Sequence, residues 1–181
     1  MAHIVEFDGQ RPKIDPTAFL APEVWIIGRV ELREKVNVWT GTIIRGDDDT
    51  VVIGNYTTVL EHCLIEAPAG MSVCIGEEVI ISHGATVHGA QIGDRVLVGI
   101  GAIILDGSKV GDGSIIGSGT LVSPRTQIPP GKLVLGIPGK AVRDIEEADT
   151  EVINRERVRT LAKAEKYRII YQRMGLTRAN V

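Results

Sequence analysis

The sequence predicts a mainly β protein: a parallel solenoid of short stacked strands, followed by a C-terminal helix. Three observations indicate this fold. Leucine, isoleucine or valine recurs every six residues along most of the chain. Hydrophobic residues make up 44% of the 181 residues but aromatic residues only 4%, so the core must be aliphatic. The 21 glycines and eight prolines are spread along the chain, as a fold with many turns requires.

The six-residue repeat can be followed through eighteen positions, with two polar breaks at residues 46–49 and 67–72 and one five-residue step after Val87. A period of six fits neither a helix nor a half-buried strand. It suits short extended segments joined by turns, three to a coil, with coils stacked roughly 4.8 Å apart. Eighteen such segments make six coils, and a β-sandwich would need the spacing to be coincidental. The positions are Leu20, Ile26, Leu32, Val38, Ile44, Ile53, Val59, Ile65, Ile75, Ile81, Val87, Ile92, Val98, Ile104, Val110, Ile116, Val122 and Ile128.

The composition changes after the regular repeat ends at Ile128. Residues 144–174 are rich in Glu, Arg, Lys and Ala, which predicts a helix. We expect Thr150 to cap this helix and Gly175 to end it. The chain is therefore divided into a β-helix domain, residues 1–143, and a C-terminal segment, residues 144–181, which packs on the prism or on a neighbouring subunit. Its apolar positions at helical spacing are Tyr167, Ile170, Tyr171 and Met174.

Charge and cysteine content indicate a cytoplasmic protein. The formal net charge of −3 gives no basic surface for nucleic acid or an anionic membrane. The N-terminal residues lack a basic region followed by an apolar run, and no apolar stretch is long enough to span a membrane. Cys63 and Cys74 form no CxxC pair, so we expect two buried thiols in a reducing compartment.

The repeat also predicts where polar side chains meet. Residues three hexads apart should lie on the same face, one coil apart. Arg45, Glu66 and His88 each follow such a position, so they should stack in one outward column. Glu61 and His83 should form a second column on the preceding face. A solvated surface with a salt bridge would explain one such column, but two histidine-bearing columns favour a metal site.

Because the faces of a prism diverge, one chain cannot easily bring His83 to His88. Around a three-fold axis, however, His83 of one subunit could meet Glu66 and His88 of the next. Two imidazoles and a carboxylate are good ligands for zinc or another divalent metal, and they leave one position open for water. The sequence thus predicts a metal site shared between subunits.

The motifs around these residues resemble those of known proteins. The hexads, over about residues 11–143, resemble those of the left-handed parallel β-helix proteins. The stretch Ile43-Ile44-Arg45-Gly46-Asp47 resembles the Arg-Gly-Asp element of the gamma-class carbonic anhydrases. The stretch from Ile81 to Gly89 resembles the two-histidine metal segment of that family, and residues 134–140 resemble the end of its repeat.

The resemblance implies a left-handed parallel β-helix that assembles as a homotrimer with sites between subunits. His83 and His88 would be metal ligands from adjoining subunits, with zinc, iron or cobalt as the metal. Arg45 and Asp47 would pair across the interface. The implied reaction is the reversible hydration of CO2 to bicarbonate by a metal-bound hydroxide.

This chain departs from the family pattern at the site itself. Glu66 stands where the family has a third histidine, and Leu60-Glu61 stands in place of Gln-Asp. An anionic ligand lowers the net charge at the metal and weakens the nucleophile. Glu61 can serve as a general base or hold a ligand in place. The alternatives are a CoA-dependent acyltransferase of the hexapeptide-repeat class and a non-catalytic metal-binding or assembly protein.

Overall fold

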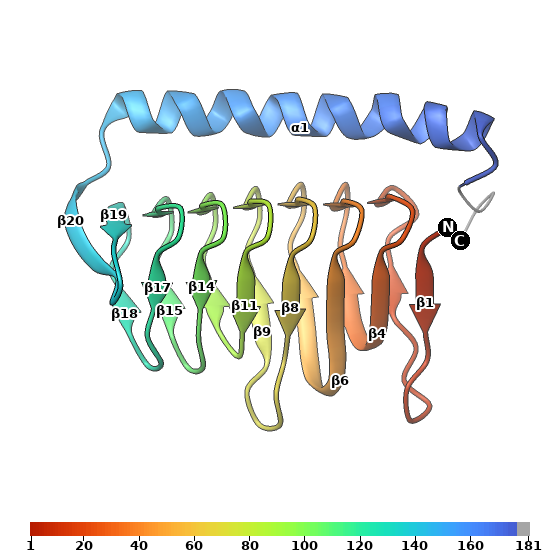
Figure 1. Ribbon diagram of the computed structural model, residues 1–181, viewed down its shortest axis with the longest axis horizontal. Helices are drawn as coiled ribbons and strands as arrows, with labels where there is room; N and C mark the ends of the chain where they lie inside the picture. The colour runs from red at the N-terminus through yellow and green to blue at the C-terminus, as the bar shows by residue number, and fades with distance from the viewer. Residues whose placement is uncertain (177–181) are drawn as a thin grey trace.

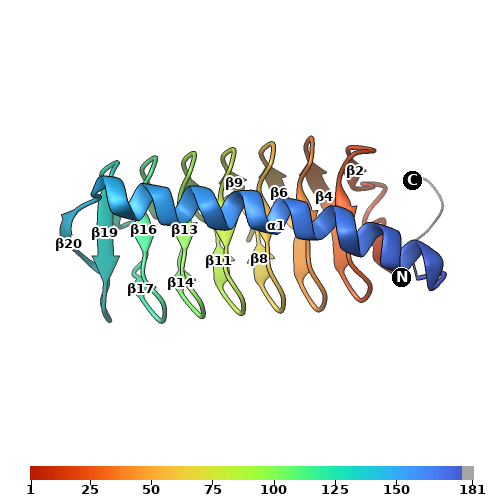
Figure 2. The same ribbon diagram turned by 90° about the horizontal axis from the view of Figure 1, so that it is seen from above.

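The structure, a computed structural model describing residues 1–176, is a three-sided prism of parallel strands with a long helix laid along it (Figures 1 and 2). Each coil contributes one short strand to each side. Residues 177–181 of the predicted C-terminal segment lie outside the described residues. Within residues 1–176, no helix has the length and apolarity that crossing a membrane requires.

The three sides of the prism differ in what covers them. The helix face lies under the helix and comprises β3 (Phe19–Leu20), β5 (Asn37–Val38), β7 (Thr58–Val59), β10 (Ile80–Ile81), β13 (Leu97–Val98), β16 (Ile115–Ile116) and β19 (Lys132–Leu135), with β20 (Lys140–Asp144) antiparallel to β19. The open face comprises β1 (His3–Val5), the first halves of β4 (Trp25–Leu32) and β6 (Ile43–Ile53), β8 (Leu64–Glu66), β11 (Thr86–His88), β14 (Ile103–Ile104) and β17 (Leu121–Val122). The polar face comprises β2 (Lys13–Ile14), the second halves of β4 and β6, β9 (Val73–Ile75), β12 (Gln91–Ile92), β15 (Lys109–Val110) and β18 (Gln127–Ile128).

The aliphatic repeat forms the core, as predicted. Seventeen of the eighteen positions are at most 7% exposed, and Leu20 is partly buried against them. Positions three hexads apart are paired across coils, as in Ile44 with Ile65 and Ile65 with Val87. Burying each of these side chains contributes about 1.5–3 kcal/mol, distributed evenly along the axis.

The repeat continues one position further than predicted. Val134 lies six residues after Ile128, is fully buried and pairs with Ile116. The turn at Pro129-Pro130-Gly131 therefore joins two coils and does not end the prism. The prediction ended the repeat at Ile128 because the two prolines that follow suggested a break. Prolines, however, fit well in a turn between short strands.

The corner between the open and polar faces is tightly packed around Gly46. β4 and β6 both run across this corner, and a Cβ atom on Gly46 would lie 2.5 Å from the carbonyl oxygen of Arg29 in the coil below. Only glycine fits so close to another backbone. Gly46 thereby fixes Arg45 and Asp47 on the two sides of one corner.

The C-terminal helix α1 (Glu147–Arg173) begins earlier than predicted. Its N-cap is Glu146, whose side chain pairs with the backbone of Asp149 while the Asp149 carboxylate accepts the Glu146 N–H. Arg143 also donates to Asp149, and this hydrogen bond lowers the pKa of that carboxyl to about 2. Thr150, the predicted cap, lies within the first turn. Gly175 adopts φ of +68° just past the end, as predicted.

The helix packs on the helix face through a narrower line of residues than predicted. Its buried positions are Ile153, Thr160 and Ala164, and Thr160 Oγ1 lies 3.3 Å from Thr58 Oγ1. The predicted face is only half correct, because Ile170 and Met174 are 44% and 62% exposed. Two of the three buried helix residues, Thr160 and Ala164, are small, whereas Ile170 and Met174 lie to the side of the contact.

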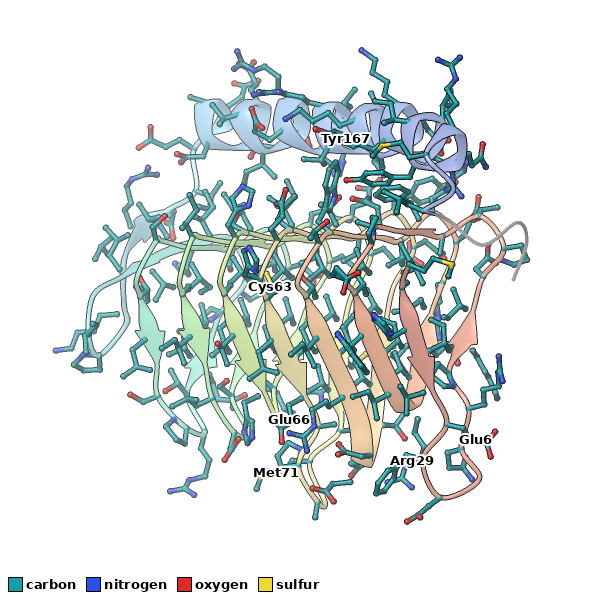
Figure 3. All side chains as sticks on the ribbon, turned by 45° about the vertical axis from the view of Figure 1, so that its right-hand side comes forward. Glu6, Arg29, Cys63, Glu66, Met71 and Tyr167 are labelled. Atoms are coloured by element: carbon teal, nitrogen blue, oxygen red, sulfur yellow. The ribbon has the colours of Figure 1, made fainter. Side chains whose placement is uncertain are left out.

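The predicted tyrosines do contact the prism. Tyr167 lies edge-on to Trp39 at 5.3 Å, and Tyr171 stacks on Phe19 at 6.2 Å between ring centroids. Figure 3 shows Tyr167 directed from the helix toward the coils. The helix therefore packs on the prism of its own chain through this aromatic cluster.

The two cysteines have different surroundings. Cys63 is 2% exposed, and burial raises the pKa of its thiol to about 12, so it is an inert core residue. Cys74 is exposed on the polar face, contrary to the prediction that both are buried. It points outward because it lies between two inward residues, Val73 and Ile75.

Candidate metal centre

The candidate ligands lie along the two edges of the open face. Glu61 and His83 precede β8 and β11, at the edge next to the helix face, whereas Glu66 and His88 end the same two strands. In Figure 3, Glu66 lies at the side of the prism away from the helix, whereas Cys63, just before β8, lies nearer to it. The two edges are separated by the width of one face.

The first predicted column is confirmed. Arg45, Glu66 and His88 occupy matching positions in β6, β8 and β11, so their Cα atoms are stacked in register. Arg45 Nη1 lies 3.4 Å from Glu66 Oε1, and Glu66 is 19% exposed. One oxygen of the Glu66 carboxylate therefore faces a cation in its own chain.

Arg45 pairs with Asp47 within the same chain, across the corner, whereas the resemblance implied a pair across the subunit interface. Its Nη2 and Nε donate to Asp47 Oδ2 at 2.8 and 3.3 Å. This hydrogen bond lowers the pKa of Asp47 and raises that of Arg45, so both remain charged at neutral pH. Asp47 Oδ1 is buried and has no hydrogen-bond partner among residues 1–176, which leaves an acceptor for a donor from elsewhere.

The second predicted column is also present, but Glu61 and His83 lie in turns at the edge of the open face and not on the preceding face itself. His83 Nδ1 lies 2.7 Å from Glu61 Oε2, and the imidazole is 51% exposed. That oxygen is buried and makes no well-directed hydrogen bond within the described residues, so the imidazole is the polar group that faces it. Glu61 thus contacts His83 from the preceding coil.

A third acidic residue, Asp106, contacts His88 from the following coil. Its Oδ1 and His88 Nδ1 form a close hydrogen-bonded pair. Sequence analysis missed this residue, because the column rule places Leu105 beside His88 and Asp106 is one position further on. The sequence signal that could have identified Asp106 was an acidic residue directly after a column position.

Both histidines therefore have Nδ1 directed at a carboxylate, which leaves Nε2 for a metal. Within the described residues of a single chain, no group of three His, Cys, Asp or Glu side chains is placed to hold a metal ion. The donor set of two imidazoles and a carboxylate nevertheless fits zinc or a similar divalent ion. The two histidines occupy opposite edges, so they suit two halves of a site.

The open face between these edges is mainly apolar. Trp25, Ile43 and Ile103 are 37–40% exposed, and Leu64 and Leu121 belong to the same stacked column, in which Thr86 between Leu64 and Ile103 is polar. The corresponding outward column of the polar face is Lys13, Glu31, Val52, Cys74, Gln91, Lys109 and Gln127. A mainly apolar exposed surface of this kind marks an interaction site.

The other two histidines, His62 and His3, lie outside both columns. His62 is exposed in a turn with φ of +60°. His3 stacks on Trp25 with 4.0 Å between ring centroids and lies 3.5 Å from Glu23. Both residues have structural surroundings that explain them.

Comparison with known proteins first identifies the class. A family model for bacterial transferase hexapeptide repeats matches residues 89–124. The crystal structure of a Bacillus cereus protein, provisionally named an acetyltransferase, is 33% identical and superposes with a TM-score of 0.92, covering 93% of this chain and 98% of that one. The protein is thus a hexapeptide-repeat β-helix.

Two sequence relatives then identify the family. A Methanocaldococcus jannaschii protein named "probable carbonic anhydrase" is 46% identical over 140 residues, which is 77% of this chain and 88% of the relative. A carbonic anhydrase of Geobacillus kaustophilus is 37% identical over 169 residues, covering 93% of both chains. The chain belongs to the gamma-class carbonic anhydrase-like family.

Proposed function

We propose that this protein is a homotrimer with three metal sites between subunits, which hydrates CO2 reversibly to bicarbonate. In each site, His83 of one subunit and Glu66 and His88 of the next hold a zinc, iron or cobalt ion. One observation carries the proposal: histidine–carboxylate pairs line both edges of a single apolar face.

The apolar face supplies the reason for assembly. Burying Trp25, Ile43 and Ile103 against other copies removes exposed apolar area from water. When three such faces turn toward a common axis, one edge of each open face meets the opposite edge of the open face on the next subunit. That arrangement joins the His83 edge to the Glu66–His88 edge. Asp47 Oδ1, buried without a partner among the described residues, then accepts a hydrogen bond across the interface.

The chain's own groups have separate roles in this site. A divalent metal held by these residues would supply Lewis acidity toward water and CO2. Glu61 holds His83 with one carboxylate oxygen, and its other oxygen serves as a general base for proton transfer. Arg45 holds the Glu66 carboxylate in place and bridges it to Asp47.

Glu66 limits the activity that we expect. As an anionic ligand in place of a neutral imidazole, it reduces the positive charge at the metal, and Arg45 at 3.4 Å offsets part of this effect. We therefore propose metal binding together with slow CO2 hydration.

A CoA-dependent acyltransferase is the second candidate, favoured by the acetyltransferase name of the similar Bacillus cereus structure. Saturable binding of acetyl-CoA by the purified protein, combined with no metal-dependent CO2 hydration, would replace the first proposal with this one. Metal binding without either activity would indicate a non-catalytic metal-binding or assembly protein.

The metal site is tested by elemental analysis of the purified protein. Wild type should carry about one metal ion per subunit, and His83→Ala and His88→Ala should each lose it, because each removes one of three ligands. His62→Ala is the control and should keep its metal. Unchanged metal content in both ligand variants would exclude the proposed site.

The trimer is tested by placing a charge on the open face. Ile103→Arg should convert the trimer to monomers in sedimentation equilibrium, because a buried unpaired guanidinium is costly at an interface. Val52→Arg places the same charge on the polar face and should remain trimeric. A trimeric Ile103→Arg variant would mean that another face makes the contact.

The effect of Glu66 is tested by restoring the imidazole. Glu66→His should raise the rate of CO2 hydration roughly tenfold or more and move the midpoint of its pH profile downward, because a neutral ligand increases the charge at the metal. Glu31→His, on the polar face, should change neither quantity. An equally metal-loaded Glu66→His variant with an unchanged rate would show that Glu66 does not limit the reaction.

A further inference from the structure

The contact between His88 and Asp106 is the histidine–carboxylate contact at the candidate metal centre that no sequence motif predicts. Asp106 follows β14 in the coil after His88, at the same corner of the prism. The imidazole is 30% exposed and the Asp106 side chain 40% exposed, so the pair lies at the rim of the open face.

The backbone around Asp106 is fixed on both sides. Its carbonyl oxygen accepts a hydrogen bond from the Arg125 N–H at 2.8 Å, and the Gly107 N–H donates to the Gly89 carbonyl oxygen at 2.7 Å. These bonds tie the Asp106 turn to the coil below and the coil above. The carboxylate is therefore held on a rigid turn beside the ring that it contacts.

Gly89, directly after His88, leaves the space that the carboxylate occupies. A Cβ atom at Gly89 would lie 3.0 Å from Asp106 Oδ1 and 3.2 Å from Pro68. A larger residue there would press on the Asp106 side chain, so the Gly89 position favours the His88–Asp106 contact.

The contact decides which ring nitrogen of His88 carries the proton. A carboxylate accepts hydrogen bonds, so Nδ1 opposite Asp106 carries the hydrogen, and the lone pair of the neutral ring is on Nε2. Carboxylates in this position fix the tautomer and the ring orientation of metal-binding histidines. At the other edge, Glu61 of the preceding coil faces His83 Nδ1 at 2.7 Å without a well-directed hydrogen bond.

We infer that Asp106 is a positioning residue that presents His88 Nε2 to the metal at the subunit interface, an inference that rests on the proposed function. Asp106 touches neither metal nor substrate and acts only through His88. The two histidines are then oriented independently, His83 by the coil before it and His88 by the coil after it. The two halves of the site are therefore formed before the subunits meet.

The first test measures zinc affinity by competition with a chromophoric chelator, using full-length protein. Asp106→Ala should bind zinc about 10–100-fold more weakly than wild type. Asp106→Asn should lose less, because the amide oxygen still accepts the Nδ1 hydrogen. Asp112→Asn is the matched control. Within residues 1–176, Asp112 accepts only the Asp94 N–H, which the amide oxygen also accepts, so the zinc affinity of this variant should not change.

The His88→Ala variant distinguishes a failure of the Asp106 inference from a failure of the proposed metal site. If His88→Ala loses zinc but Asp106→Ala binds within threefold of wild type, the Asp106 inference is wrong and the metal site stands. If His88→Ala binds zinc as tightly as wild type, His88 is no ligand and both ideas fail.

The second test needs no metal. In the apoprotein, nitrogen-15 NMR of the histidine side chains should show the His88 hydrogen on Nδ1. In Asp106→Ala the hydrogen should move mainly to Nε2, whereas Asp112→Asn should keep the wild-type pattern. An unchanged tautomer in Asp106→Ala would overturn the inference even if the affinity fell, because the loss would then come from a general structural change.

Discussion

The fixed register between coils is the constraint on which the rest of the structure depends. Parallel strands stack at roughly 4.8 Å, and each aliphatic position lies directly on its counterpart one coil away. Any side chain beside these positions is therefore placed as well. Glu61 contacts His83, and Glu66 is stacked in register with His88, because each pair is one coil apart. The same register puts the two pairs on opposite edges of one face, which makes each a half-site.

Charge at the Glu66 edge is balanced within the chain. Arg45 is paired with Asp47 and faces Glu66, so one cation serves two carboxylates. The arrangement depends on Gly46, since no larger residue fits against Arg29 at this corner. In the proposed site, the Glu66 carboxylate contacts both the Arg45 guanidinium and the metal. The guanidinium therefore reduces the effect of the carboxylate's negative charge on the metal. The His83 edge has no such cation among its described contacts, so the two half-sites differ in charge.

Much of this could be predicted from the sequence, because burial repeats with a fixed period. The core positions, the stacked columns and the end of the helix at Gly175 all follow from local rules. Contacts that depend on the length and direction of individual side chains could not be predicted. Asp106 lies one residue off the column, and the Glu146 cap depends on a reciprocal bond with Asp149. The exposure of Ile170 depends on how the helix rolls on the prism, and the hand of the winding comes from family resemblance alone.

The central claim, that each metal site takes one histidine from each of two subunits, is tested most directly with mixed trimers. His83→Ala and His88→Ala chains carrying different tags would be co-expressed, and trimers containing both would be isolated for metal analysis. In a ring, every mixed trimer has one interface at which an intact His83 faces an intact His88. We predict one metal ion per mixed trimer and none in either parent. Mixed trimers without metal, or parents that retain it, would contradict the shared site.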